Sequence, residues 1–193
     1  MFDHFNFLAP VYDIFIQPRP PQKLIKLMNL NGDEKLLDVG GGTGRISQFL
    51  IDETSSIFLA DLSFEMLKQG TEKHGLISIN SHSESLPFPD QEFDRVIMVD
   101  ALHHVCDQQQ TALELWRVLK PGGRIVIEEP DINRFVVKLV ALMEKIALMR
   151  SHFLSGDEIA DLFNPIKRAK PITKIVKEDH FAWVVITKPH KIA

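Results

Sequence analysis

The stretch Lys35-Leu-Leu-Asp-Val-Gly-Gly-Gly-Thr-Gly-Arg-Ile-Ser47 decides the fold of this chain. Apolar residues come directly before a run of glycines, and apolar residues with helical spacing come directly after it. This order predicts a buried strand, a tight turn and a helix that begins near Thr43. Glycines in such a turn let a ligand lie against the main chain, beside the N–H groups at the start of the helix. We therefore expect a ligand-binding turn here.

The spacing of the glycines separates two classes of ligand. A dinucleotide requires G-x-G-x-x-G, and the third glycine of that pattern would fall at Arg45. The glycines instead read G-x-G-x-G at Gly40, Gly42 and Gly44, with Asp38 two residues before them. A carboxylate at this place opposes a phosphate and favours a cation, such as the ammonium of a bound amino acid. The spacing counts against a nicotinamide-dependent oxidoreductase.

Length and composition predict one ordinary globular domain. The chain has 193 residues, of which 45% are hydrophobic and 25% are charged. A net charge of -4 gives no general attraction to nucleic acid. The single cysteine, Cys106, excludes an internal disulfide framework and a multi-cysteine metal site. Neither a signal-peptide pattern nor a membrane-spanning apolar run is present, so we expect a cytoplasmic enzyme.

The residues after the turn alternate between strand and helix patterns. Apolar runs predict strands at 57–60, 76–80, 93–99 and 124–128, and two final strands at 172–177 and 181–187. Helical spacing is seen at 24–30, 111–119, 132–150 and 155–163. Asp61 ends the second strand, about 20 residues after the glycines, where a carboxylate accepts hydrogen bonds from ribose hydroxyls. Its alternative role is to cap the next helix, a role that Ser63 can fill equally well.

Several of these segments resemble the class I S-adenosylmethionine-dependent methyltransferases, and among them the UbiE-like group of ubiquinone and menaquinone biosynthesis. The acidic residue and G-x-G-x-G resemble the first motif of the family, and residues 59–67 resemble its second, G-x-D-x-S-x-x-M-L. Leu-Pro-Phe-Pro-Asp90, Ala-Leu-His-His-Val105 and the run RVLKPGGRIVI resemble three more. The resemblance covers roughly residues 9–130. It implies a Rossmann-like α/β fold with a seven-stranded, mostly parallel sheet of order 3-2-1-4-5-7-6, an antiparallel last strand and helices on both faces.

The resemblance also implies S-adenosylmethionine as the cofactor. Tyr12, in a segment that resembles A-x-x-YD, would close over the cofactor, and Leu62 and Met66 would pack against the adenine. His82 stands where the family has an acidic residue that accepts a hydrogen bond from the adenine amino group. Glu84 is the alternative acceptor of this hydrogen bond. The cofactor contacts expected in this way are Tyr12, Asp38, Gly40, Gly42, Gly44, Asp61, Leu62, Met66, His82, Ser83, Glu84, Asp100 and Ala101.

The function implied is transfer of a methyl group from S-adenosylmethionine to a small-molecule acceptor. The alternatives are a non-catalytic sensor or partner subunit that binds the cofactor and, less favoured, the nicotinamide-dependent oxidoreductase. No catalytic base is identified; Tyr12, Asp13, His103 and Glu128 are the places to look. We expect no metal site, because His103 and His104 are adjacent and their side chains point in different directions.

Two segments lie outside the repeating pattern. Residues 1–30 are expected to form an N-terminal cap, and residues 132–163 a helical insertion over or beside the site. The apolar stripe of 132–150 has several explanations: a helix packed on the sheet, a lid over an apolar acceptor, a homodimer face or a basic contact with a membrane surface.

Overall fold

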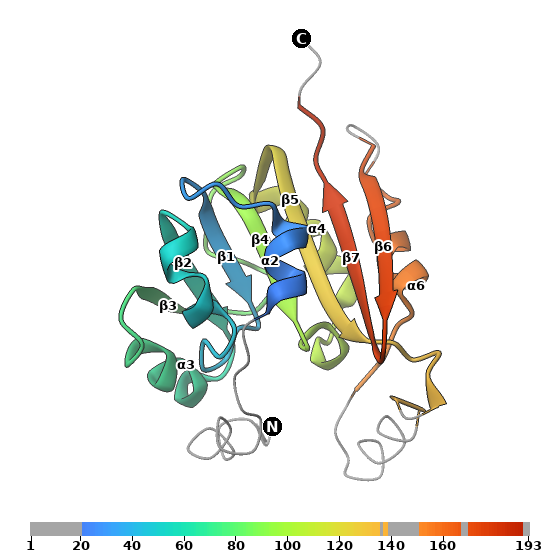
Figure 1. Cartoon of the computed structure of the whole chain (residues 1–193), viewed down its shortest axis with the longest axis horizontal. Helices are drawn as coiled ribbons and strands as arrows, with labels where there is room; N and C mark the ends of the chain where they lie inside the picture. The colour runs from blue at the N-terminus through green and yellow to red at the C-terminus, as the bar shows by residue number, and fades with distance from the viewer. Residues whose placement is uncertain (1–20, 136, 139–150, 167–169, 191–193) are drawn as a thin grey trace.

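The central feature of the computed structural model is a single sheet of seven strands (Figure 1). The structure describes residues 21–135, 137–138, 151–166 and 170–190. The strand order is β3-β2-β1-β4-β5-β7-β6, and β7 runs antiparallel to both of its neighbours while the other pairs are parallel. The strands are β1 (Lys35–Val39), β2 (Ser56–Asp61), β3 (Leu76–Asn80), β4 (Phe93–Val99), β5 (Leu119–Pro130), β6 (Ile172–Glu178) and β7 (Phe181–Thr187). The predicted fold class and strand order are confirmed.

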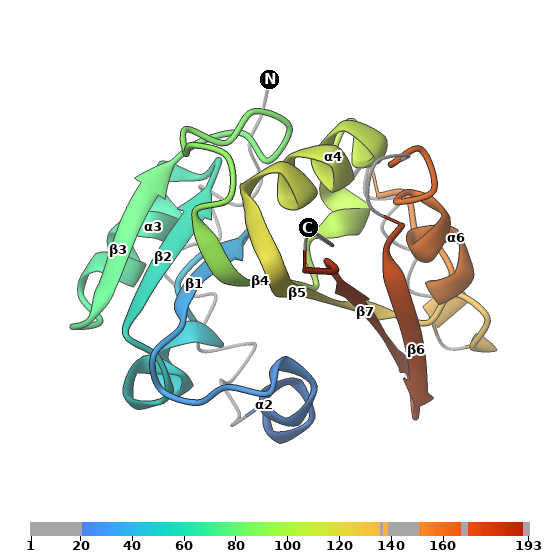
Figure 2. The same cartoon turned by 90° about the horizontal axis from the view of Figure 1, so that it is seen from above.

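Helices cover both faces of this sheet. Seen from above, α2 lies on one side, and α4 and α6 lie on the other (Figure 2). The α-helices are α2 (Gln22–Met28), α3 (Phe64–Thr71), α4 (Gln108–Val118) and α6 (Gly156–Asp161), and the 3-10 helices are η1 (Ser47–Phe49), η2 (Ile51–Glu53) and η3 (Leu102–His104). Among the helices of the described residues, none has the length and apolar character needed to cross a bilayer.

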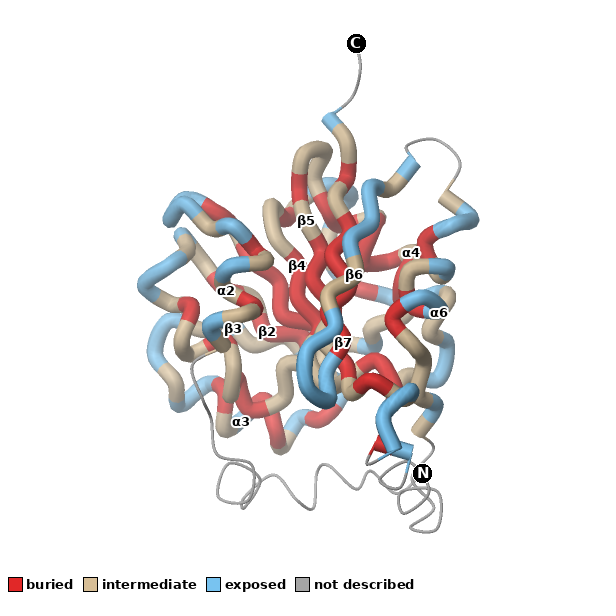
Figure 3. The backbone as a smooth tube through the Cα atoms, turned by 45° about the vertical axis from the view of Figure 1, so that its right-hand side comes forward, coloured by how far each residue is buried: buried red, intermediate tan, exposed pale blue. Residues whose placement is uncertain are grey.

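The central strands are buried on both faces, as a parallel sheet between helices requires. Successive residues of one strand enter different cores: Ile125 and Ile127 belong to the cluster on the α4 side, whereas Val126 belongs to the cluster with Leu24 and Met28 of α2. The same alternation holds along β1, β4 and β7. Figure 3 shows the buried residues concentrated in β4 and β5, and the outermost strand β6 largely exposed. The two cores fix the strand ends and thereby the site.

The segment after the glycine turn differs from the expectation. An α-helix beginning near Thr43 was predicted, but the chain forms turns followed by η1 and η2. Most backbone bonds here join residues three apart, such as Phe49 N to Ile46 O and Leu50 N to Ser47 O, and only Gln48 N to Gly44 O spans four residues. In addition, the Ser47 hydroxyl donates to the side chain of Asp38 at 2.6 Å. The prediction of a regular helix was wrong at this point.

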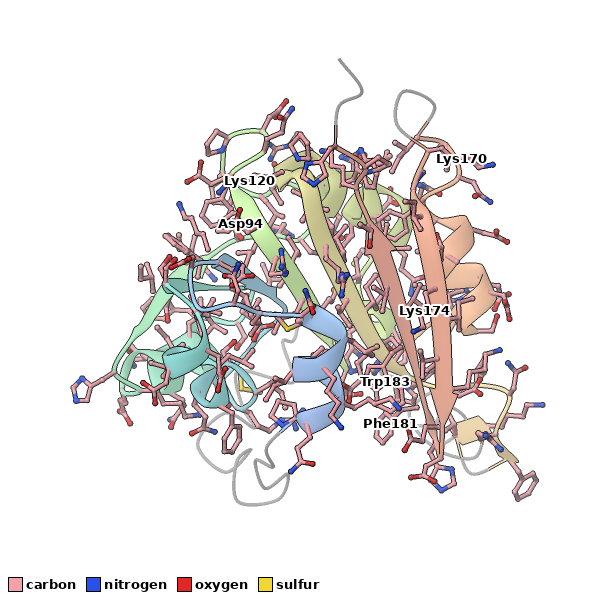
Figure 4. All side chains as sticks on the ribbon, turned by 45° about the horizontal axis from the view of Figure 1, so that its top comes forward. Asp94, Lys120, Lys170, Lys174, Phe181 and Trp183 are labelled. Carbon is pink, nitrogen blue, oxygen red and sulfur yellow. The ribbon has the colours of Figure 1, made fainter. Side chains whose placement is uncertain are left out.

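Charged residues at the amino ends of the strands serve the fold rather than the site. Asp94 accepts hydrogen bonds from Lys120 Nζ at 2.8 and 2.9 Å and from the Lys35 backbone N–H at 3.0 Å. Figure 4 shows Asp94 and Lys120 close together at one end of the sheet, and Phe181 and Trp183 at the other. That second end, where β5 finishes and β7 begins, is the carboxyl edge of the parallel strands.

Candidate active site

The glycine turn forms the floor of the site at the carboxyl end of β1. Gly40 has φ +72° and Gly42 has φ +54°, backbone conformations that favour glycine. A Cβ added to Gly40 would lie 2.6 Å from the Cβ of Ala101, so the turn and the residues after β4 are in close contact. The Gly42 N–H donates to Oδ2 of Asp61 at 2.8 Å, which fixes the turn to the end of β2.

A cavity of about 380 Å³ opens above this floor, along the carboxyl ends of β1, β2 and β4. Open parallel sheets bind their ligands at this edge, and the volume suits a nucleoside-sized ligand. The predicted contact residues that line it are Asp38, Gly40, Gly42, Asp61, Leu62, Met66, His82, Ser83, Glu84, Asp100 and Ala101. Residues that the predictions did not name also line it, among them Arg45, His104, Val105 and Cys106.

Two of the predicted contacts are not part of this wall. Gly44 is directed away from the cavity; a Cβ there would lie 2.5 Å from Cδ1 of Leu76, so its φ of +71° serves the packing of the turn. Tyr12 lies outside the described residues, as do Asp13 and most of 132–150.

The end of β2 presents a carboxylate and an apolar surface to the cavity. Asp61 accepts the Ser63 N–H at 2.7 Å through Oδ1, in addition to the Gly42 contact. Capping of α3 is done by Ser63, whose hydroxyl accepts the Met66 N–H at 3.3 Å. Leu62 is 55% exposed although it is apolar, and Met66 is buried beside it. This wall suits a ribose and a flat base.

The far wall at this end comes from residues 82–84. The side chain of His82 is 66% exposed and its Nδ1 lies 4.0 Å from Oε2 of Glu84. The hydroxyl groups of Ser83 and Thr111 in α4 are hydrogen-bonded at 3.1 Å, and the Ser83 hydroxyl also donates to the Glu84 carboxylate at 3.2 Å. His82 and Glu84 therefore both line the position at which an adenine amino group is expected.

Asp38, near the carboxyl end of β1, also lines the cavity and is buried behind the glycine turn. Burial raises the pKa of its carboxyl to about 7; the Ser47 hydroxyl opposes this rise, the charge of Asp61 adds to it and the charge of Arg45 opposes it. A carboxylate with this environment gains from a cation nearby, because the cation compensates the lost hydration of the charged form. The ammonium of an amino-acid group is such a cation.

The turn after β4 is fixed by Glu129 of β5. Its Oε1 accepts the N–H groups of Ala101 and Leu102 at 2.9 and 2.7 Å, and its Oε2 lies 2.5 Å from Nδ1 of His103. Both His103 and Glu129 are 3% exposed. The turn begins at Asp100, which adopts φ +54°, a rare conformation for a residue with a side chain. Glu128 and Glu129 both close β5, and the sequence left open which of them faces this turn, because strand alternation alone does not say which of two adjacent carboxylates turns inward.

His104, the last residue of η3, borders the same cavity. Its ring lies 4.0 Å from that of His103, centroid to centroid, and its Nδ1 is 3.3 Å from the Ser151 hydroxyl. Burial and, to a smaller extent, the charge of His103 lower the pKa of His104 to about 3. The cavity wall therefore carries an uncharged imidazole.

Glu128 lies on the other side of β5 from the His103 pair. Its Oε2 accepts the indole N–H of Trp183 in β7 at 2.8 Å. Burial raises the pKa of Glu128, while the hydrogen bond from Trp183 lowers it. In the described residues, no set of three His, Cys, Asp or Glu side chains gathers in a way that could bind a metal ion.

The fold and the site together define a class of protein. A 3-2-1-4-5-7-6 sheet with an antiparallel β7 carries a glycine turn, a carboxylate at the end of β2 and a buried carboxyl group near the end of β1. The residues present fit both an adenosine and an amino-acid group. These features define a class I S-adenosylmethionine-dependent methyltransferase domain.

Comparison with known proteins gives the same family. Residues 37–127 match the family model described as a methyltransferase domain, and this part of the chain belongs to that family. Over 115 residues the chain is 35% identical to the ubiquinone/menaquinone biosynthesis C-methyltransferase UbiE of Proteus mirabilis, an alignment that covers 54% of this chain and 46% of the relative. The corresponding protein of Cronobacter sakazakii is 38% identical over 106 residues, or 50% and 42% of the two chains. The chain thus aligns with less than half the length of these relatives.

Solved structures show the same fold at low sequence identity. The methyltransferase chain from a complex with the Haloferax volcanii Trm112 methyltransferase activator superimposes with a TM-score of 0.82 at 18% identity, over 98% of this chain and 100% of that one. The YcgJ protein of Bacillus subtilis gives a TM-score of 0.71 at 18% identity, over 88% and 97%. At this identity the likeness concerns the fold alone.

Proposed function

We propose that this chain binds S-adenosylmethionine in the cavity above the glycine turn and transfers its methyl group to a small-molecule acceptor. The observation that supports the proposal is the set of residues that line this cavity, which includes Asp38, Asp61 and Leu62. Asp61 would bind the ribose hydroxyls, and Leu62 would pack on the adenine. Asp38 would face the ammonium group, since burial leaves this carboxylate in need of a cation.

S-adenosylmethionine supplies an already activated methyl group, so the protein's task is to align an acceptor with it and to exclude water. The turn after β4 performs the alignment in this account. Asp100 and Ala101 face the cofactor side of the cavity, while His104, Val105 and Cys106 continue the wall beyond them. His104 stays uncharged, so it would orient a hydroxyl or N–H of the acceptor by a hydrogen bond rather than by charge.

The acceptor would approach from the side of Cys106. A second, more open hollow of about 430 Å³ shares this residue with the cavity and extends to Leu154 and Leu162. The UbiE proteins are described as ubiquinone/menaquinone biosynthesis C-methyltransferases, so an aromatic quinol is the first acceptor class to test.

The N-terminal segment and the segment 132–163, parts of which lie outside the described residues, belong to this proposal as well. We infer that residues 1–30, with Tyr12, cap the cofactor, and that residues 132–163 lie over or beside the acceptor. The His152 N–H donates to the His103 carbonyl at 2.7 Å, and Gln108 Nε2 donates to the carbonyls of Leu102 and His152. The chain that follows 132–150 is therefore bound to the active-site turn. A homodimer through 132–150 remains the competing proposal, and light scattering of the purified chain distinguishes the two.

The function is tested by incubating the protein with S-adenosylmethionine that carries a radiolabelled methyl group, together with a panel of reduced naphthoquinols and benzoquinols. Label in the extracted organic product supports the proposal. Tight binding of S-adenosylhomocysteine without transfer to any member of a broad acceptor panel favours the non-catalytic sensor instead.

A further inference from the structure

A strap of three consecutive residues, Ser151, His152 and Phe153, contacts the turn that follows β4. The Ser151 hydroxyl lies 3.3 Å from Nδ1 of His104. The His152 N–H donates to the carbonyl oxygen of His103 at 2.7 Å. The Phe153 ring stacks on the ring of His103, with the two centroids 4.3 Å apart and an angle of 13° between the planes. The strap therefore contacts both imidazole residues of this turn.

Gln108, the first residue of α4, joins the strap to the turn. Its Nε2 donates to the carbonyl of Leu102 at 2.9 Å and to the carbonyl of His152 at 2.8 Å. Both partners are acceptors and a side-chain amide nitrogen carries two N–H donors, so these contacts fix the orientation of the amide. The start of α4 is fixed as well, because the Asp107 carboxylate accepts the Gln110 N–H at 2.9 Å and caps the helix.

The turn is held from two sides, by Glu129 and by the strap. Glu129 of β5 accepts the N–H groups of Ala101 and Leu102. The carbonyl groups of Leu102 and His103 are bound on the strap side, the first by Gln108 and the second by the strap backbone. Glu129 thus fixes the start of the turn to the sheet, whereas the strap reaches the later part of the turn.

His104 is the residue of this later part whose place matters for an acceptor, because it borders the cavity. Its ring lies 4.0 Å from the His103 ring, centroid to centroid, and the His103 ring is stacked on Phe153. A row of three rings therefore runs from the strap to the wall of the cavity. A side chain that aligns a reacting group must be held by its own packing, since misplacement by about 1 Å loses much of the effect.

We propose that Gln108 is a positioning residue for the acceptor side of the site: by holding the strap against the turn, it fixes where the His104 ring lies. This inference rests on the proposed function, because His104 is assigned to the acceptor only in that account. Gln108 itself lines the second hollow, beside Cys106, and is not part of the wall of the cofactor cavity that the structure describes. It therefore acts through His104, and cofactor binding does not depend on it.

The test removes the amide donor and keeps the length of the side chain. Gln108→Met loses both hydrogen bonds. Gln109→Met is the matched control, because Gln109 Nε2 donates to the Leu162 carbonyl at 2.7 Å from the next position of the same helix. Three quantities are measured for each protein: hydrogen exchange of the His152 N–H, the nuclear magnetic resonance shifts of the His104 ring and the calorimetric affinity for S-adenosylhomocysteine. The His104 signals are assigned by their loss in His104→Gln.

The expected result is a change on the acceptor side alone. In Gln108→Met the His152 N–H exchanges about 10- to 100-fold faster, as the loss of two hydrogen bonds implies, and the His104 ring shifts move away from their wild-type values. In Gln109→Met the exchange rate stays within about twofold of the wild type and the ring shifts are unchanged. All three proteins bind S-adenosylhomocysteine with affinities within about twofold, which also shows that the variants are folded.

A second pair of variants tests the row of rings independently of Gln108. Phe153→Leu removes the ring that stacks on His103 and should move the His104 ring shifts as Gln108→Met does. Phe153→Tyr keeps the ring and should restore the wild-type shifts. Identical His104 shifts in Phe153→Leu and the wild type would mean that the strap does not position this imidazole.

Three results for Gln108→Met overturn the inference and leave the proposed function in place. Faster exchange of His152 with unchanged His104 shifts means that the ring is held from the Glu129 side. Changes equal to those of Gln109→Met mean that the effect belongs to α4 as a whole, and a parallel loss of S-adenosylhomocysteine affinity means that Gln108 supports the entire turn. Failure of the wild-type protein to bind S-adenosylhomocysteine overturns the proposed function, and it is recognised separately because exchange and ring shifts are measured without a ligand.

Discussion

The carboxylate of Glu129 and the imidazole of His103 lie 2.5 Å apart, Oε2 to Nδ1, in a position where both side chains are 3% exposed. The second oxygen of Glu129 accepts two backbone N–H groups from the same turn. One side chain of β5 thus holds the whole turn that follows β4. In the proposed function, this turn would supply both the wall that faces the cofactor and the wall that faces the acceptor.

Replacing Glu129 with alanine should therefore destabilise the protein and open the site. Two buried N–H groups and one imidazole lose their acceptor, at about 1–3 kcal/mol for each unsatisfied group, so we expect a loss of about 3 kcal/mol in the free energy of unfolding. Urea denaturation measures this loss, and the exposed Glu178→Ala, which breaks the surface ion pair with Lys23, is the matched control at less than about 1 kcal/mol. A loss for Glu129→Ala no larger than that of the control contradicts the assignment.

The close contact between Gly40 and Ala101 gives a prediction that separates two costs of adding a side chain: the backbone strain of a positive φ and the steric clash with a neighbour. Gly40→Ala and Gly32→Ala both place a side chain at a positive φ, which costs about 1–2 kcal/mol. Gly32 has open space around it, whereas the new Cβ at Gly40 would lie 2.6 Å from that of Ala101. We expect Gly40→Ala to lower the free energy of unfolding by about 1–3 kcal/mol more than Gly32→Ala does, as measured by urea denaturation. Gly40→Ala should also weaken S-adenosylhomocysteine binding. Equal stability of the two variants would show that the turn after β4 moves freely.

Much of this arrangement is visible in the sequence, and some of it is not. The strand limits follow from apolar runs and turn residues, and the ends of β4 and β7 were predicted to the residue, because two packed faces leave little freedom in where a strand begins and ends. The strand order was implied by the family resemblance and is confirmed. The α-helix expected after the turn does not form; the Ser47 hydroxyl donates to Asp38, and most backbone hydrogen bonds there join residues three apart. The spacing of apolar residues carries no information about these hydrogen bonds.

The site was predictable where a residue type has few alternatives. Asp61 and Leu62 follow a strand at a spacing that fixes which edge they reach, and both line the cavity. The contacts of Glu129 and His104 were not predicted, because they depend on which partner lies across the sheet or the turn. Gly44 was expected to meet the ligand but faces Leu76, since a positive φ alone does not distinguish contact with a ligand from contact with a neighbouring strand.

The pKa of Asp38 predicts a pH dependence for stability. The folded pKa is about 7 and the ordinary value is 3.8, so between these values the folded state holds a proton that the unfolded state has released. The free energy of unfolding of the ligand-free protein should accordingly contain a contribution that is lost as pH rises from about 4 to about 7. Asp38→Asn removes this contribution, and urea denaturation at a series of pH values measures it. An identical pH profile for wild type and variant would contradict the burial of the charge.

The same carboxyl group predicts a pH dependence for ligand binding. If Asp38 meets the ligand ammonium, binding stabilises its ionised form, so S-adenosylhomocysteine affinity should rise with pH up to about 7 and level off above it. In Asp38→Asn the affinity should be lower and independent of pH over this range. Calorimetry in two buffers of different ionisation heat should detect proton release below pH 7 in the wild type alone. Proton release that persists in the variant would assign it to another group.

His104 should remain uncharged at all pH values at which the enzyme is folded and active. Burial lowers its pKa to about 3, so its ring signals in nuclear magnetic resonance should not shift between pH 5 and pH 8. The matched control is His82, whose side chain is 66% exposed and which is assigned by the loss of its signal in His82→Gln. A His104 titration midpoint near neutrality would contradict an uncharged wall and restore this residue as a candidate general base.

Direct titration of the purified protein with S-adenosylhomocysteine, with NADH in parallel, tests the central claim that this cavity binds the methyltransferase cofactor. We predict saturable binding of S-adenosylhomocysteine alone, weakened at least about tenfold by Asp61→Ala and unaffected by Asp52→Ala, an exposed carboxylate outside the cavity. Binding of NADH without binding of S-adenosylhomocysteine would contradict the claim and show that the turn after β1 holds a dinucleotide.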